Sequence, residues 1–425
     1  MIDRLRGRFF YGWIIVATIA AAHFTEVGEF NPVLAVFMKP MAQEFNWSRA
    51  QVSLGISIGS LIGAGLAPVV GPLVDRYGPR VAMVAGQGLY GGCLLLVSLV
   101  KRLWQFYLLY SSGRGLVLGV TSLAGNVTIS NWFIRRRGRA LGLANLGSRV
   151  GQAGMPPLCQ IIILAYSWRL AWALLGFMVW AVAVIPSYLF LKQRPESMGL
   201  RPDGDPVLAD GTVGRDTVVG GGGVPQEDEP IWSLGEAMRT PSLWLITLAI
   251  SQGSVVGAGV NLHLVPYLTD QGLPPLVAVG TSSALFVMGG IGGLAWGFLA
   301  ERFPVRYCAA CALFLASLSV GFLVILSGIF SAYIFAAVYG FVLGGTNLLI
   351  NLALANYFGR RSLGAITGFV FPFQLMANSI GPLAAGLTYD LTGGYAPAFI
   401  LFSISYFLAS VWMFMARPPA AQRAN

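Results

Sequence analysis

The chain has 425 residues, of which 56% are hydrophobic and only 10% charged, and its mean hydropathy is +0.70. A soluble protein of this length needs a charged surface that this composition does not supply, so we expect an integral membrane protein. The formal net charge of +10 falls mainly in short segments beside apolar stretches, where it faces anionic lipid, so we expect no nucleic-acid partner.

Twelve apolar stretches are long enough to cross the roughly 30 Å hydrocarbon core of a bilayer. Of the 27 Lys and Arg residues, 20 fall in the segments on one side, five on the other, and two, Arg114 and Arg149, inside stretches. The positive-inside rule then predicts cytoplasmic termini, and we expect the bacterial inner (plasma) membrane. The stretches cover residues 11–37, 50–73, 81–100, 104–133, 140–165, 170–191, 243–268, 276–299, 307–329, 332–358, 363–388 and 396–416.

The longest polar interval separates the stretches into two groups of six. It contains four consecutive glycines, 220–223, and mixed charges ending in Glu227-Asp228-Glu229, which is typical of a flexible cytoplasmic linker. No Lys-Ser/Thr pair follows the glycines, so they do not indicate a phosphate loop. We therefore predict an N-terminal six-helix bundle over 1–191, a linker over 192–240 and a C-terminal six-helix bundle over 241–425.

Two motifs recur in the two halves at nearly one offset, which predicts parallel repeats about an axis along the membrane normal, with a cavity between them. A third pattern places a small residue at every fourth position, which predicts close helix contact in lipid. At an offset of 226, Gly71, Asp75, Arg76 and Arg80 match Gly297, Glu301, Arg302 and Arg306; at 225, Gly119, Asn126, Asn131 and Arg135 match Gly344, Asn351, Asn356 and Arg360; the small residues are Gly63, Ala67 and Gly71, matched by Gly289, Gly293 and Gly297.

The segment from Gly71 to Arg80 resembles the loop signature between the second and third helices of the major facilitator superfamily. Segments 11–13, 45–49, 194–204 and 263–269 are similar to the bacterial relatives of monocarboxylate transporters and oxalate/formate antiporters. The resemblance implies an all-α membrane protein with twelve transmembrane helices in two pseudo-symmetric six-helix bundles. It also implies secondary active transport by alternating access.

The resemblance further implies a gate latch on the cytoplasmic side. In the alternative interpretation, Asp75 and Arg76 only end helices and anchor the topology. One departure from the relatives is the absence of any charge in the eighth and eleventh stretches, where those relatives place cations. The gating residues implied are Gly71, Asp75, Arg76, Gly78 and Arg80, with Glu301 and Arg302 in the second half.

Ionisable side chains at bilayer depth are costly and therefore candidates for function. At 1.5 Å per residue, Arg114 and Arg149 each lie about 15 Å from the membrane surface, and His23 lies at a similar depth. We assign the substrate's negative group first to Arg149 and then to Arg114. In the alternative interpretation Arg114 is a packing element.

Glu26 and Glu29 follow His23 at spacings of three, so the three side chains can share a helix face. We interpret them as the proton-coupling set, because two carboxylates one turn apart should not both be ionised in a low dielectric. Alternatively, one of the two glutamates neutralises an arginine across the bundle.

The second half offers uncharged polar groups within its stretches. Gln374 and Asn378, one turn apart, can hydrogen-bond either a substrate or a neighbouring helix, whereas we assign His263 a structural role.

The leading hypothesis is proton-coupled transport of a small organic anion such as a monocarboxylate. The alternative is efflux of a hydrophobic or cationic compound, with Glu26 and Glu29 selecting positive charge; a sensor that kept the fold but lost transport is a third. We expect no enzyme, because the sequence holds no nucleophile–base pair or His-rich metal set. We expect a monomer with no cofactor and no metal, whose partners are the small-molecule substrate, its proton and the lipid bilayer.

Overall fold

The computed structural model describes residues 10–133, 136–192, 195–198, 200–201, 203, 232–359 and 363–419, which are almost entirely helical. The predicted linker, 192–240, lies largely outside these residues. In the first half the elements are α1 (Gly12–Thr25), η2 (Glu26–Glu29), α2 (Asn31–Phe45), α3 (Arg49–Tyr77), α4 (Pro79–Val97), α5 (Leu103–Leu116), η3 (Val117–Thr121), α6 (Ser122–Trp132), α7 (Arg137–Ala165), α8 (Trp168–Met178), η4 (Val179–Val184), α9 (Ile185–Phe190) and η5 (Pro195–Met198).

The second half begins with a short helix that precedes six long ones. Its elements are α10 (Leu234–Met238), α11 (Pro241–Asp270), α12 (Pro275–Arg302), α13 (Val305–Phe322), η7 (Leu323–Ile325), α14 (Gly328–Phe358), α15 (Leu363–Thr392) and α16 (Ala396–Met415).

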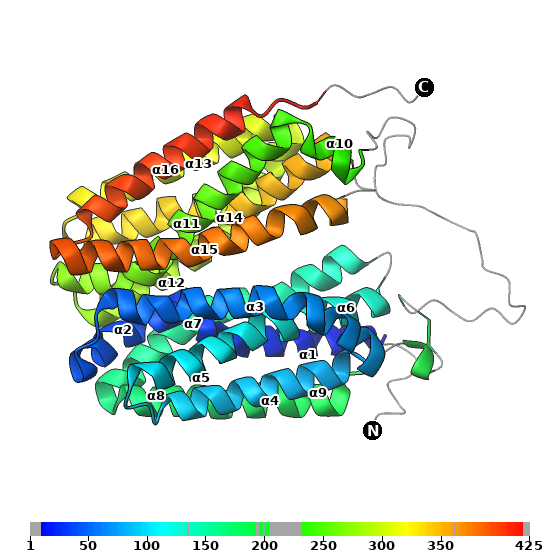
Figure 1. The fold of residues 1–425 in the computed structure, drawn as a ribbon, viewed down its shortest axis with the longest axis horizontal. Helices are drawn as coiled ribbons and strands as arrows, with labels where there is room; N and C mark the ends of the chain where they lie inside the picture. Colours follow the sequence, from blue (N-terminus) through cyan, green and yellow to red (C-terminus); the bar gives the residue numbers. More distant parts are fainter. Residues whose placement is uncertain are drawn as a thin grey trace, which may run out of the picture.

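Where helical elements follow one another without a long loop, they form rods. Apart from η5 and α10, the described residues give six rods before residue 192 and six after residue 240. Eight of these are long and apolar enough to cross a membrane by length and hydropathy. Figure 1 shows the rods of the first half, blue to blue-green, packed together on one side of the molecule and those of the second half, green to red, on the other.

In the described part of the chain the two bundles meet mainly where α2 contacts α11, α3 contacts α15, and α7 contacts α12. Within each bundle the rods pack through small residues. A Cβ atom on Gly119 would lie 2.8 Å from the carbonyl oxygen of Gly63, and one on Gly344 would lie 1.8 Å from that of Gly289. These are the same two positions of the repeat in each half. Only hydrogen atoms as side chains allow the backbones to approach so closely.

The first span differs from the single helix predicted over 11–37. The structure ends α1 at Thr25, continues with the tighter turn η2, places Phe30 in an extended conformation (φ −80°, ψ 149°) and begins α2 at Asn31. Pro32 explains the break, because a proline lacks the N–H that would continue the helix and its ring clashes with the carbonyl four residues earlier. The stretch 11–37 therefore lies almost entirely within one candidate span, Gly12–Phe45, whose helix is interrupted at Glu26–Phe30.

Candidate functional site

A cavity of about 290 Å³ lies between the two halves. Its wall on the first half comes from the start of α2, from α5 and η3, and from α7; the wall on the second half comes from α11, α12, α14, α15 and α16. Arg114 carries the only formal charge among the described lining residues. The polar lining residues are Asn31, Arg114, Gln152, Ser254, Asn261, Thr346, Gln374, Asn378 and Tyr406, and the larger apolar ones are Phe30, Leu118, Ile250, Phe286, Leu343, Ile350, Phe371 and Leu375.

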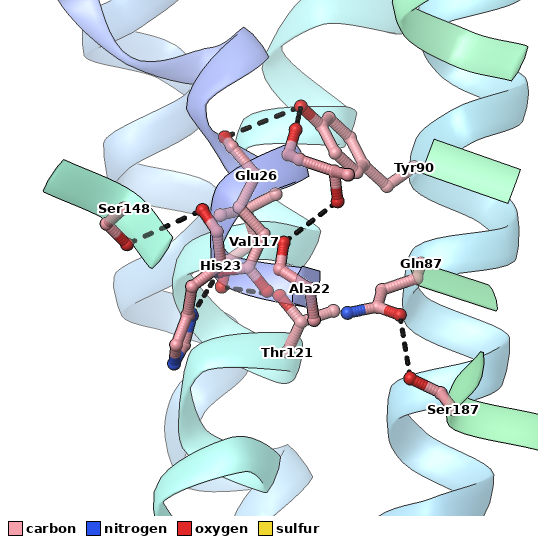
Figure 2. Close-up of polar contacts among 10 residues, drawn as sticks. Ala22, His23, Glu26, Gln87, Tyr90, Val117, Thr121, Ser148 and Ser187 are labelled. Carbon is pink, nitrogen blue, oxygen red and sulfur yellow. Dashed lines mark hydrogen bonds and ion pairs between the residues drawn. The ribbon is translucent and has the colours of Figure 1, made fainter. Parts of the chain in front are cut away.

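The break between α1 and α2 borders this cavity, and neighbouring helices donate hydrogen bonds to its carbonyl groups. The hydroxyl of Tyr90 in α4 donates to the carbonyl oxygens of Thr25 at 3.2 Å and Glu26 at 3.4 Å (Figure 2). The hydroxyl of Tyr110 in α5 donates to the carbonyl oxygen of Glu29 at 3.2 Å. Carbonyl groups at an interrupted helix benefit from such donors in the bilayer, so α4 and α5 stabilise the break.

Arg114 connects the break to the cavity. Its side chain is 6% exposed; Nη1 donates to the carbonyl oxygen of Glu29, and Nε donates to Oγ of Ser60 in α3 at 3.1 Å. Gly59 makes room for it, since a Cβ there would lie 2.8 Å from the Cβ of Arg114. The guanidinium therefore stabilises the fold locally and also presents a positive charge to the cavity.

The Glu29 carboxyl group points away from solvent into the first bundle. It is 1% exposed, and neither of its oxygens has a hydrogen-bond partner among the described residues. It packs against Gly113 of α5, where an added Cβ would lie 2.7 Å from Oε1. Arg114 is close enough to act on this carboxyl electrostatically.

His23 and Glu26 form a buried pair on the other side of the break. Nδ1 of His23 lies 2.8 Å from Oε2 of Glu26, while Nε2 of the histidine and Oε1 of the glutamate have no partner among the described residues. Figure 2 shows this pair beside Ser148 of α7, whose hydroxyl donates to the carbonyl oxygen of His23 at 3.5 Å. The structure thus joins two of the three predicted proton-coupling residues, and Glu29 has no hydrogen bond to either.

The predicted substrate residues do not all lie together. Arg114, Gln374 and Asn378 border the cavity, but Arg149 is exposed on α7, does not line the cavity, and has no hydrogen bond or ion pair with a described residue. Gln152, about one turn further along α7, does line it. Among the described residues Arg149 forms no ion pair with Glu26 or Glu29, whereas Arg114 donates to the backbone carbonyl of Glu29.

Several polar lining residues were missed by reasoning from the sequence alone, and two of them, Asn31 and Gln152, lie in the first half. Asn31 lies directly at the break, and its Nδ2 donates to the carbonyl oxygen of Ala258 in α11 at 3.0 Å, across the two halves. Pro32 was a sequence signal for the break and could have pointed to Asn31. Gln152 could have been found as the uncharged neighbour of Arg149 on α7.

The motif predicted to form a gate lies at the junction of α3 and α4. Gly78 has φ 86°, a conformation that favours glycine, and Pro79 then begins α4. Arg80 donates to the carbonyl oxygen of Tyr188 in α9, and its guanidinium lies 5.1 Å from the centre of that tyrosine ring. Arg76, Glu301 and Arg302 are exposed, whereas the side chain of Asp75 lies outside the described part of the chain.

Comparison with known proteins identifies the family. The family model for the Major Facilitator Superfamily matches residues 13–374 and 281–425. The chain belongs to this superfamily. It is therefore an integral membrane protein, as its apolar rods also indicate. A bacterial homologue of the human lysosomal transporter Spinster, solved in an inward-facing and unoccupied conformation, shares the fold: the TM-score is 0.72 at 16% identity, covering 96% of this chain and 98% of that one.

Several named proteins are similar in sequence to this chain over most of its length. Monocarboxylate transporter 13 of Bos taurus is 26% identical over 92% of this chain and 86% of its own length. The membrane sensor protein UhpC of Salmonella typhimurium is 29% identical over 80% and 78%, and the oxalate:formate antiporter of Oxalobacter formigenes is 22% identical over 88% and 84%. The resemblance to monocarboxylate transporters and oxalate/formate antiporters seen in the sequence is confirmed.

Proposed function

We propose that this protein is a proton-coupled transporter that moves a small organic anion, such as a monocarboxylate, by alternating access. The observation that carries the proposal is the placement of Arg114. It is the single charged residue among the described residues that line the cavity, and it is bonded to the helix break that contains Glu26 and Glu29. The names of the monocarboxylate and oxalate:formate relatives support an anionic substrate.

The anion would bind to Arg114. A guanidinium has about five N–H groups in a planar fork, and two hydrogen bonds, to Glu29 and Ser60, leave the remaining donors for a carboxylate. The amides of Gln374 and Asn378 stand among the lining residues of the second half and would hydrogen-bond the rest of the substrate. A ligand that contacts both halves would favour closure of the two bundles around the cavity.

The proton would reside on Glu29, with His23 and Glu26 as a neighbouring pair that can pass it on. When anion and proton are both bound, the anion neutralises Arg114 and the proton neutralises Glu29. When both are absent, the guanidinium and the carboxylate offset each other. Binding of only one leaves a net charge in a low-dielectric region, which is costly during reorientation. Coupling then follows from charge balance within the site.

The alternative of efflux of a cationic compound has less support from the geometry. A cation needs a carboxylate or an aromatic cage that faces it, and no Asp or Glu is present among the described residues that line the cavity. Glu26 and Glu29 are both buried inside the first bundle. Their positions suit proton exchange better than contact with a cation in the cavity.

The test is uptake by the purified full-length protein in proteoliposomes. A panel of labelled monocarboxylates, dicarboxylates and cationic compounds would be assayed with and without an inward proton gradient. We expect accumulation of a monocarboxylate only with the gradient, and little binding of its uncharged methyl ester. Gradient-driven movement of cationic compounds, with no carboxylate transported or bound, would overturn the proposal.

A further inference from the structure

The end of the molecule opposite the start of α1 is held closed by charged contacts between the two halves. Here α2 ends, α3 begins, and α11 and α15 both end (Figure 1, left). We call this the distal end, and the charge distribution of the loops predicts that it faces the outside of the cell. None of the contacts below involves a residue that lines the cavity.

Arg49, the first residue of α3, is the centre of these contacts. It is only 9% exposed, and its three side-chain partners among the described residues all belong to the second half. Its Nη1 lies 2.7 Å from Oδ2 of Asp270 at the end of α11 and donates to the hydroxyl of Tyr395 at 2.6 Å. Its guanidinium also lies 3.7 Å from the ring centre of Tyr389 in α15. A buried arginine with these partners fixes the relative position of the two bundles.

Asp390 of α15 binds the backbone at the same place. Its Oδ1 accepts from the N–H of Arg49 at 3.1 Å, and its Oδ2 accepts from the N–H of Ala50 at 2.9 Å. These are among the first N–H groups of α3, which have no partner within the helix and favour a negative charge. A carboxylate of one half therefore caps a helix of the other.

Two further contacts hold the distal end. Asp270 also pairs with Lys39 of α2, with Oδ1 2.7 Å from Nζ. Nδ1 of the fully buried His263 lies 2.9 Å from the hydroxyl of Tyr395, and its Nε2 lies 2.9 Å from the carbonyl oxygen of Pro382. Since a carbonyl can only accept, Nε2 carries the hydrogen and Nδ1 accepts from Tyr395, which in turn accepts from Arg49. The hydrogen bonds therefore run in one direction, from Arg49 of α3 through Tyr395 to His263 of α11, which donates to Pro382 of α15.

The backbones of the two halves also approach closely at this point. A Cβ atom on Gly386 of α15 would lie 2.9 Å from the Cα of Ala50, and the hydroxyl of Ser57 donates to the carbonyl oxygen of Ser379. Opening a path to the distal side therefore requires breaking the contacts of Arg49. The conformation described here is the one that those contacts favour.

We propose that Arg49, with Asp270 and Asp390, forms a distal latch that sets the balance between the two alternating-access states without touching the substrate. This assignment is independent of the substrate and of the proton site. Loss of the latch moves the protein toward the state that is open at the distal end. It changes apparent affinity and turnover only through that change of population.

The test measures the opening of the distal end directly. Nitroxide labels would be attached at Gln43 of α2 and Thr392 of α15, which are both exposed, in full-length protein whose four native cysteines have been replaced. Pulsed electron spin resonance in nanodiscs would then give the distance distribution without ligand. We expect one short-distance population in the latched protein. Asp270→Asn and Arg49→Gln should each increase the long-distance fraction at least threefold.

The chain offers a matched control at the same end. Arg169 of α8 pairs with Glu44 of α2 at 2.6 Å, but both residues belong to the first half. Arg169→Gln removes an ion pair of the same kind and should leave the distances unchanged. If Arg49→Gln does not fold, Asp270→Asn and Asp390→Asn decide the question. Unchanged distances in these folded variants, or an equal change in Arg169→Gln, would overturn the latch, whatever substrate is transported.

Discussion

The two halves of the molecule share a backbone plan and differ in chemistry. The contact of Gly63 with Gly119 recurs as that of Gly289 with Gly344. The first span of the first half is broken at Glu26–Glu29 and buries two carboxyl groups and a histidine. The corresponding first rod of the second half, α11, is one uninterrupted helix of 30 residues.

The charged residues show the same difference. In the second half, every described Asp, Glu, Lys and Arg of the long rods lies at or near the end of its rod. Its contribution to the cavity is a set of amides and hydroxyls, whereas the first half contributes Arg114. Alternating access needs two similar bundles that can rock against each other, but the charge that binds and couples needs to be present in one bundle only.

The sharpest test of this asymmetry is Arg114→Gln. Removing one partner of a desolvated charge pair costs about 2–5 kcal/mol, so we expect anion binding to weaken about 30-fold or more in calorimetric titration. Arg114→Lys should recover only part of the affinity, because an ammonium does not reproduce the planar fork.

Arg149→Gln is the matched comparison for Arg114→Gln, because it removes a guanidinium that does not line the cavity. We expect a change of less than about threefold, the scale of less than 1 kcal/mol that is typical of an exposed, unpaired charge. A larger loss in Arg149→Gln than in Arg114→Gln would restore the assignment made from the sequence.

Glu29→Gln tests whether the proton site belongs to the first half. The amide imitates the protonated carboxyl in shape, so accumulation driven by a proton gradient should disappear while exchange of substrate across the membrane continues. Glu26→Gln should reduce accumulation less, because His23 and Glu29 remain. Concentrative uptake that survives in both variants would place the proton site elsewhere.

The shared backbone plan can be tested through stability. A Cβ on Gly344 would overlap the carbonyl oxygen of Gly289, whereas one on Gly290 would meet nothing within 4 Å. Overpacking typically costs about 1–3 kcal/mol, so Gly344→Ala should lower the melting temperature in detergent by several degrees. Gly290→Ala should leave it unchanged, and Gly119→Ala, where the overlap is smaller, should fall between them. Equal melting temperatures in the three variants would show that the helices accommodate the added methyl group without loss of stability.

The smallest effect is expected at the helix break itself. Tyr90→Phe removes the hydroxyl that donates to the carbonyls of Thr25 and Glu26, and we expect a loss of about 1 kcal/mol in stability. Tyr357→Phe in α14 removes a hydroxyl that donates to the carbonyl oxygen of Ala416, and neither residue lines the cavity, so substrate exchange should slow only in the Tyr90 variant. Equal exchange rates in the two variants would argue against a role of the break in transport.

Much of the fold could be read from local properties of the sequence. Twelve apolar stretches of sufficient length and a repeat at 225–226 residues indicated two bundles, because bilayer thickness and helix contact impose these patterns on neighbouring residues. The motif from Gly71 to Arg80 identified the superfamily. The buried ionisable residues could also be recognised, since charge is rare at bilayer depth.

Only the tertiary structure decided which of these residues share a site. Arg114 and Arg149 were equivalent by depth, but rotation of a helix about its own axis determines which side chain borders the cavity, and packing against other helices sets that rotation. The contacts of Asn31 with Ala258 and of Arg49 with Asp270 join residues more than 200 positions apart. The sequence by itself determined the spans and the charges they bury. The cavity and the latch arise where the two bundles meet, because each requires side chains from both.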